Sequence, residues 1–89
     1  MNFCIYGLGS TGKSAAKFLK SKNFNNIKTW DDKMRTKKRK KKFLKYLDSS
    51  DYIIVSPGIN LKKSKFKNNL FRNKHKIITD LDLFYLFNP

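Results

Sequence analysis

Residues 7–14 read Gly7-Leu8-Gly9-Ser10-Thr11-Gly12-Lys13-Ser14, and this glycine-rich stretch decides the fold. It follows an apolar run at residues 3–6 and leads into residues 14–22, where apolar side chains recur at helical spacing. This order predicts a strand, a glycine turn and a helix. The N-terminus of a helix carries unpaired N–H groups and a partial positive charge, and glycines allow close approach to them. The stretch therefore predicts a binding site for an anion such as a phosphate.

The stretch satisfies two phosphate-binding patterns, G-x-G-x-x-G of dinucleotide-type folds and G-x-x-x-x-G-K-S of P-loop NTPases. The first pattern requires an acidic residue about 20 residues further on, at the end of a second strand, and Asp31 and Asp32 follow the strand predicted at 27–30. The second requires a later strand that ends in an aspartate for magnesium, but the strand predicted at 52–55 leads into Ser56-Pro57-Gly58. The Rossmann-like interpretation is therefore favoured. A P-loop that uses Lys13, and a turn that binds nothing, remain as alternatives.

Apolar patterning predicts that strands and helices alternate along the whole chain. The strands are expected at 3–6, 27–30, 52–55 and 76–79, and the helices at 14–22, 36–47, 61–73 and after Asp80, which is expected to cap the last one. This series predicts one α/β domain, a Rossmann-like parallel sheet of four to five strands flanked by helices. Ligands of such folds bind at the carboxyl ends of the strands, where residues 9–12, 31–32 and 56–58 are expected to converge.

The chain is strongly basic, with 21 lysine and arginine residues against 6 acidic ones and a net charge of +15. A pI near 10.2 is typical of nucleic-acid-binding domains. Lysines outnumber arginines by 18 to 3, however, and they are spread from Lys13 to Lys76 in a chain that contains no glutamate. That composition is typical of an A+T-rich genome, and no nucleic-acid-binding signature accompanies it. We therefore expect no specific nucleic-acid partner, and keep a basic nucleic-acid-binding domain as an alternative.

Length and cysteine content limit the protein further. The 89 residues suffice for one domain with a small core. Cys4 is the single cysteine, so we expect a buried thiol in a reducing compartment. No apolar stretch approaches the roughly 18 residues of a membrane span, and glycines interrupt the N-terminal apolar run. These features predict a cytoplasmic protein without a membrane partner.

Several other side chains are expected to be structural. We expect Trp30 at the edge of the core rather than stacked on a base, and His75 at the surface rather than in a metal or catalytic site. Asp48 is expected to be solvated beside a turn. The predicted helix at 61–73 is expected to place four apolar residues on one side: Leu61, Phe66, Leu70 and Phe71.

Four segments, taken together, resemble a known family. In order and spacing, residues 7–12, 30–32, 55–59 and 79–84 are similar to the N-terminal domain of the UDP-N-acetylmuramoyl-L-alanine--D-glutamate ligases, the MurD type of Mur ligase. The resemblance covers nearly the whole chain. It implies a domain that holds the UDP end of the muramoyl substrate and does not bind NAD. The enzyme it implies is an ATP-dependent bacterial ligase, which adds D-glutamate to UDP-N-acetylmuramoyl-L-alanine during peptidoglycan precursor synthesis.

The resemblance also implies a role for each candidate site residue. Gly9, Ser10, Thr11 and Gly12 would surround the diphosphate at the start of the first helix. Asp31, Asp32 and Lys33 would meet the uridine, although Lys33 stands where the family frequently has an arginine. Ser56, Pro57 and Gly58 would form the turn beside the uracil, with Gly58 closest to the base.

The family's ATP and D-glutamate sites lie in two further domains, which the resemblance implies are absent from these residues. Residues 1–89 are thus expected to be the N-terminal, UDP-binding domain of a longer ligase. We expect it to be monomeric, with no catalytic residue, metal site or cofactor of its own. ATP and magnesium are implied for the full-length enzyme. A stand-alone nucleotide-binding module, of the NAD or P-loop type, is the remaining alternative.

Overall fold

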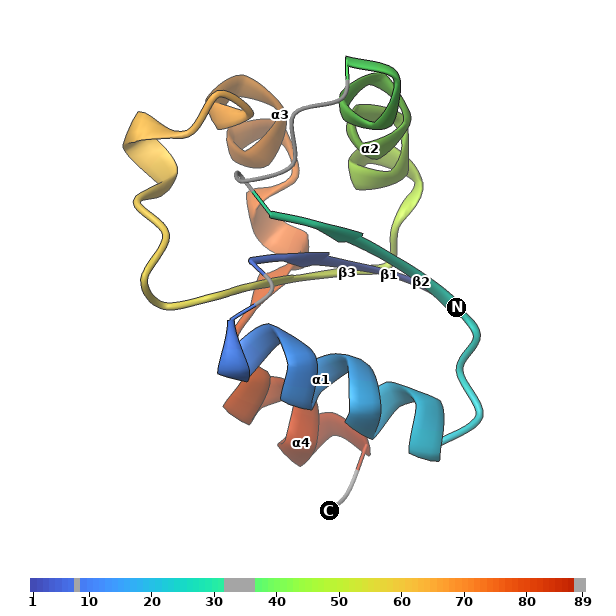
Figure 1. The fold of residues 1–89 in the computed structure, drawn as a ribbon. Coiled ribbons are helices and arrows are strands. Elements are labelled where there is room, and N and C mark those ends of the chain that lie inside the picture. Colours follow the sequence, from blue (N-terminus) through green and yellow to red (C-terminus); the bar gives the residue numbers. More distant parts are fainter. Residues whose placement is uncertain (8, 32–36, 88–89) are drawn as a thin grey trace.

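The computed structural model describes residues 1–7, 9–31 and 37–87, which alternate between strands and helices (Figure 1). The elements are β1 (Asn2–Tyr6), α1 (Ser10–Ser21), β2 (Asn26–Trp30), α2 (Lys37–Ser49), β3 (Tyr52–Val55), η1 (Leu61–Lys63), α3 (Lys67–Arg72), η2 (Lys74–Lys76), β4 (Ile77–Ile78) and α4 (Asp80–Phe87). The strands form one parallel sheet in the order β2-β1-β3-β4. The predicted α/β class and parallel sheet are confirmed.

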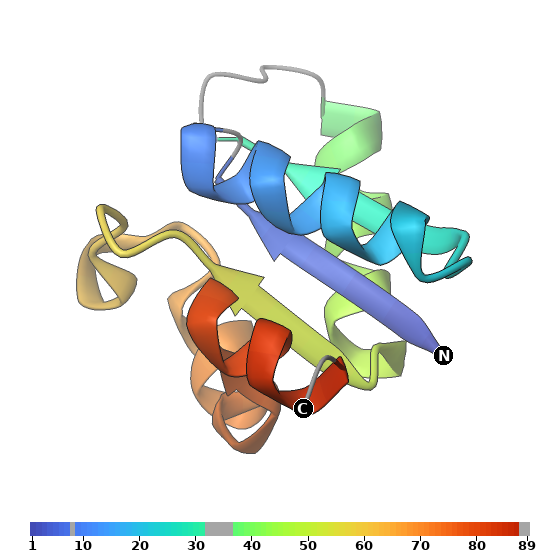
Figure 2. The ribbon, with the colours of Figure 1, turned by 90° about the horizontal axis from the view of Figure 1, so that it is seen from below.

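Helices cover both faces of the sheet. Helices α1 and α4 lie side by side on one face, and α2 and α3 lie on the other (Figures 1 and 2). The chain moves outward from β1 to β2 and then returns past β1 to β3. Open α/β sheets bind their ligands at such a reversal, which here lies at the carboxyl ends of β1 and β3.

Strand β1 is buried on both faces because it lies inside the sheet. Its side chains alternate, with Phe3 and Ile5 facing α1 and α4, and Cys4 and Tyr6 facing α2 and α3. A continuous apolar run is typical of such a strand. Cys4 is 1% exposed, and burial raises the pKa of its thiol to about 11. Its predicted role as a small buried side chain is confirmed.

Aromatic rings fill the core beneath α2 and α3. The Trp30 ring lies 5.8 Å from that of Phe43 and 5.3 Å from that of Phe66, measured between centroids. Trp30 is 1% exposed, so its face is not available to a base. The expected core position of Trp30 is confirmed. His75 is exposed, as predicted.

The single helix predicted over 61–73 is wrong, because the chain breaks between η1 and α3. The Ser64 hydroxyl accepts a hydrogen bond from the Phe66 N–H at 3.1 Å and shares another with the Tyr6 hydroxyl at 2.7 Å. A serine that bonds its local backbone competes with helix formation. Phe71 does not pack with the other apolar residues as predicted: it is 70% exposed, while its neighbour Leu70 in α3 is buried.

The start of α4 also differs from prediction. Thr79, rather than Asp80, caps the helix: the Thr79 hydroxyl accepts from the Asp82 N–H at 3.2 Å. The Asp82 carboxylate in turn accepts from the Thr79 N–H at 3.1 Å. This reciprocal pair is the geometry of a capping box with aspartate in place of glutamate. Asp80 is the first helical residue, next to the positive end of the helix dipole.

Asp48 joins α2 to α3 and is not merely solvated. Its carboxylate accepts from Asn73 Nδ2 at 2.8 Å and from the Arg72 guanidinium at 3.0 Å. Its backbone carbonyl accepts from Lys76 Nζ at 2.8 Å. The Asn73 hydrogen bond, followed by Arg72, holds the pKa of Asp48 below its ordinary 3.8.

We expect Asp48→Ala to lower the free energy of unfolding at neutral pH, because the hydrogen bonds of the carboxylate to Asn73 and Arg72 are lost. The loss should be only about 1 kcal/mol, because the Asp48 side chain is 48% exposed and solvent weakens its interactions. The pKa is lowered in the folded state, so the stabilisation is full above 3.8 and is lost as the pH falls through the lower, folded value. Urea unfolding at neutral and acidic pH measures this. The two proteins should converge in acid, and an equal gap at both pH values would contradict an electrostatic role.

Candidate functional site

The first residues of the loops that follow β1, β2 and β3 lie together at the carboxyl edge of the sheet. The Gly7 N–H donates to the Trp30 carbonyl and links the end of β1 to the end of β2 at 2.6 Å. The Ser56 N–H donates to the Tyr6 carbonyl at 3.0 Å and links β3 to β1. The glycine turn, Asp31 and the turn after β3 are therefore neighbours, as the sequence predicts.

Gly7 shapes the turn that leaves β1. Its φ of 102° lies in the left-handed region, which side chains other than glycine rarely adopt. A Cβ at this position would also lie 2.8 Å from Cβ of Ser56 and 2.9 Å from Cδ1 of Ile59. Gly7 therefore permits both the turn and its contact with the loop after β3.

Gly12 and Gly9 have different roles in the same turn. A Cβ on Gly12 would lie 1.8 Å from the Gly7 carbonyl oxygen, so only glycine lets α1 pack against the end of β1. A Cβ on Gly9 would meet no atom of the described residues within 4 Å. In the dinucleotide-type fold the three glycines of this pattern allow a tight turn, a close approach of the ligand and close packing of helix on strand, in that order.

The N-terminus of α1 is suited to an anion. Gly9 is its N-cap and has no side chain that could cap the helix, and the first turn of the helix contains no acidic residue. In the first backbone hydrogen bond of the helix, the Lys13 N–H donates to the Gly9 carbonyl at 3.0 Å. The N–H groups of the preceding residues have no acceptor within the helix, and Ser10 and Thr11 lie at this end, exposed and half-buried respectively.

The conformation of the stretch does not fit a P-loop. In a P-loop the residues between the glycines wrap around the phosphates, and the lysine follows the loop. Here α1 already begins at Ser10, so Gly12 and Lys13 belong to the helix. Lys13 is exposed on that helix. The geometry favours the Rossmann-like interpretation over the P-loop alternative.

The turn after β3 presents an open glycine. The Ile59 N–H donates to the Ser56 carbonyl at 3.0 Å, which closes a four-residue turn with Pro57 and Gly58 at its centre. A Cβ on Gly58 would meet no atom of the described residues within 4 Å, and the φ of Gly58 is not in the left-handed region. Neither packing against the described residues nor backbone conformation therefore requires glycine at this position.

The remaining predicted site residues are only partly placed. Asp31 follows β2 and is half-buried. Asp32 and Lys33 lie outside the described residues. A hollow of about 240 Å³ lies beside Ser56 and Pro57, and Thr79 and Asp82 also line it. This hollow was not predicted from the sequence, although the resemblance of residues 79–84 to the family pointed to that segment.

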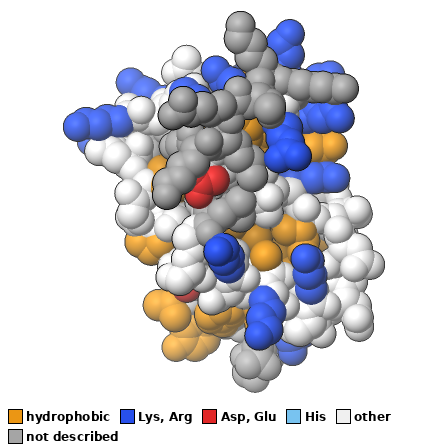
Figure 3. Space-filling model, viewed as in Figure 1, with side chains coloured by type: hydrophobic (Ala, Val, Ile, Leu, Met, Phe, Trp, Pro, Cys, Tyr) orange, Lys and Arg blue, Asp and Glu red, His pale blue; other side chains and the backbone are white. Residues whose placement is uncertain are grey.

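The surface around the site is basic without forming one stripe. Lysine and arginine side chains are scattered over several elements in this view (Figure 3). Within the described ranges, histidine, cysteine and carboxylate side chains do not gather into a group of three that could hold a metal ion. None of the helices in those ranges is both long and apolar enough to cross a membrane.

Comparison with known proteins finds relatives among bacterial ligases. The chain is 43% identical over 84 residues to the UDP-N-acetylmuramoylalanine--D-glutamate ligases of Francisella tularensis subsp. tularensis (strain WY96-3418), subsp. holarctica (strain OSU18) and subsp. novicida (strain U112). The chain is related to this ligase. The match covers 93% of the chain but only 18% of each ligase, at the ligase's N-terminal end. No protein-family model and no solved structure matches the sequence.

The relationship to the ligase confirms the resemblance drawn from four segments of sequence. The structure shows a structural role for two of those four segments. Residues 7–12 form the turn that packs α1 on β1, and residues 55–59 form the turn that contacts it. Both lie at the carboxyl ends of β1 and β3, where open sheets of this strand order generally bind ligands.

Proposed function

We propose that residues 1–89 form the UDP-binding N-terminal domain of a ligase that adds D-glutamate to UDP-N-acetylmuramoyl-L-alanine. The observation that carries the proposal is the match of nearly the whole chain to the ligases of Francisella. The chain spans 18% of their length, so the complete reaction requires parts of the enzyme outside these residues. The domain alone binds substrate without catalysis.

The proposed binding mode uses the carboxyl edge of the sheet. The diphosphate lies at the N-terminus of α1, where the N–H groups near Ser10 and Thr11 and the dipole favour negative charge. Asp31 accepts hydrogen bonds from the uridine, with Asp32 and Lys33 beside it. The base lies against the open turn at Gly58.

ATP and magnesium belong to the longer enzyme in this proposal. The described residues hold no group of three candidate metal ligands, and Lys13 is part of a helix rather than of a phosphate-binding loop. The proposal also keeps the expected monomer, the cytoplasmic location and the lack of a specific nucleic-acid partner as predictions.

Calorimetric titration with UDP, NAD and ATP plus magnesium tests the proposal. UDP should bind more tightly than the other two, and UDP-N-acetylmuramoyl-L-alanine at least as tightly as UDP. Preferred binding of NAD would favour a stand-alone dinucleotide module, which shares the three glycine roles and Asp31. A duplex DNA titration in the same buffer should show weak binding that falls steeply with salt.

We expect Lys13→Ala to leave UDP affinity within about 1 kcal/mol, the scale of an exposed charge contact. The reason is that Lys13 is an exposed residue inside α1. The same calorimetric titration measures the difference. A loss of several kcal/mol, accompanied by magnesium-dependent ATP binding, would restore the P-loop interpretation.

A further inference from the structure

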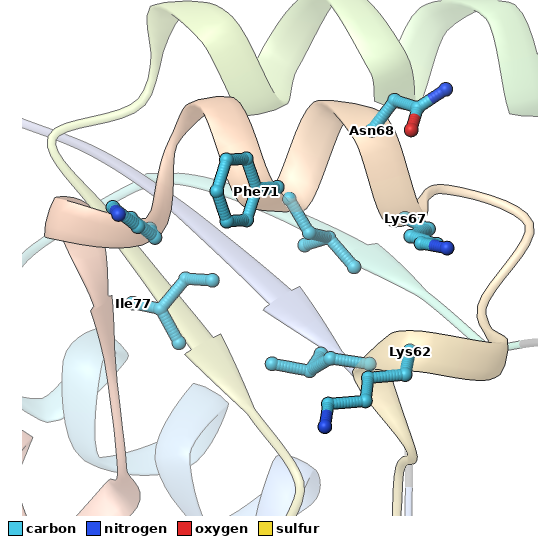
Figure 4. Close-up of a pocket in the computed structure, with 8 residues that line it drawn as sticks. Lys62, Lys67, Asn68, Phe71 and Ile77 are labelled. Carbon is cyan, nitrogen blue, oxygen red and sulfur yellow. The ribbon is translucent and has the colours of Figure 1, made fainter.

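A second cavity lies away from the glycine turn, between η1, α3, η2 and β4. Its volume is about 570 Å³, within the range of pockets that hold small molecules. In the close-up, Phe71 and Ile77 lie on one side of this cavity, and Lys62 and Lys67 lie on the other (Figure 4). The described residues of the turns at 7–12 and 56–58 do not line it.

The inner wall of the cavity is apolar. Leu61, Leu70, Phe71 and Ile77 contribute to it. Phe71 is 70% exposed, although its ring belongs to a class of side chain that folding normally buries. Phe71 follows the buried Leu70 in α3, and successive residues of a helix lie about 100° apart around its axis, so the Phe71 ring lies off the buried face. The wall therefore offers apolar surface that the described part of the chain leaves in contact with solvent.

The rim of the cavity is positively charged. Lys62, Lys67 and Lys74 line it, and none of the acidic residues that the structure describes does. Lys74 Nζ lies 4.7 Å from the centroid of the Phe71 ring, so one ammonium group lies directly beside the apolar wall. A ligand that fits both features must combine an apolar body with a negative charge at one end.

We propose that this cavity binds an amphipathic anion, a single apolar chain that carries one negatively charged headgroup. The chain lies against Phe71 and Ile77, and the headgroup meets the lysines of the rim. Burial of apolar surface supplies most of the affinity. The exposed lysines contribute less, but they determine the sign of the charge that is accepted.

The cavity adjoins the proposed substrate site without being part of it. Leu61 and Ile77 also line the smaller hollow that contains Ser56 and Pro57, so the two spaces share a wall. The inference nevertheless stands apart from the proposed function. UDP affinity and affinity for the amphipathic anion can be measured separately on the same chain.

The test is calorimetry of the 89-residue chain with decanoate, below the concentration at which decanoate forms micelles. Decyltrimethylammonium has the same apolar chain and the opposite charge, and it serves as the matched ligand. Decanoate should bind one to one and at least fivefold more tightly than the cation. Shortening the chain should weaken binding about two- to fourfold for each methylene removed.

Two variants locate the binding. Phe71→Ser should weaken decanoate binding about tenfold while leaving folding and UDP affinity unchanged, because the ring is largely exposed. Lys62→Gln combined with Lys74→Gln should weaken it about fivefold. The matched control is Lys17→Gln with Lys45→Gln, which removes the same charge from exposed positions that do not line the cavity. The control should bind like the wild type.

Three results would overturn the inference. Equal binding of decanoate and the cation would show that only apolar surface is recognised. Equal loss in the control pair would show that only net charge matters. Self-association that disappears in Phe71→Ser, with no decanoate binding, would assign the cavity to a second copy of the chain. Its α4 carries Asp80, Asp82 and exposed Leu81 and Tyr85.

Discussion

Gly12→Ala should destabilise the fold by roughly 3 kcal/mol or more, enough to unfold much of a small domain. Alanine normally stabilises a helix relative to glycine by about 0.5 to 1 kcal/mol, so the expected sign is the reverse of the usual one. The reason is steric. The added Cβ would lie 1.8 Å from the Gly7 carbonyl oxygen, and a backbone atom cannot move aside without shifting α1 from β1.

Urea unfolding followed by circular dichroism measures the effect. Gly9→Ala is the matched control, because it adds the same methyl group to the same turn where nothing lies within 4 Å. Its cost should stay within about 1 kcal/mol, the difference between glycine and alanine at an N-cap. Equal stability of Gly12→Ala and wild type would mean that α1 does not pack on β1 as described.

Gly58→Val should reduce UDP affinity roughly tenfold or more and leave the free energy of unfolding within about 1 kcal/mol. The branched side chain occupies space that the chain leaves open, so it obstructs the base and not the fold. Calorimetry with UDP gives the affinity, and urea unfolding gives the stability.

Asn25→Val is the control for this variant. Asn25 is exposed and precedes β2, so the same side chain is introduced at the opposite, amino edge of the sheet. UDP affinity should not change there. If Gly58→Val binds UDP like the wild type, the base does not lie against the turn after β3.

The parts of the fold that were predictable depend on local sequence. Strands β1 and β3 read as continuous apolar runs because both are covered on two faces, and their bounds at the carboxyl end agree with prediction. The glycine pattern predicted the turn and the helix that follows. The helix begins at Ser10, four residues before the predicted start at Ser14, because the glycine stretch itself enters the helix.

The parts that were not predictable depend on contacts between distant residues. The break before α3 involves Ser64 and the Tyr6 hydroxyl, which are 58 positions apart, and helical spacing alone cannot show it. The hydrogen bonds from Arg72 and Asn73 to Asp48 also join distant residues, so the spacing around Asp48 could not predict them.

The candidate site was likewise predictable only in part. Sequence spacing was enough to bring residues 9–12, Asp31 and residues 56–58 to one edge, because parallel strands end together. It could not distinguish Gly12, which packing requires, from Gly9 and Gly58, which packing leaves open. That distinction needs the position of neighbouring atoms, and it shows at which of these glycines a larger side chain would clash with the described residues.

Titration of the ¹⁵N-labelled chain with UDP, followed by amide resonances, tests the central claim most directly. The claim predicts that the largest shifts occur at Ser10, Thr11 and Gly58, which come from the start of α1 and the turn after β3. Amides near Phe71 and on the basic helix α2 should shift little. Saturable UDP binding whose shifts are confined to α2 or to the cavity at Phe71, with none at the N-terminus of α1, would contradict the claim.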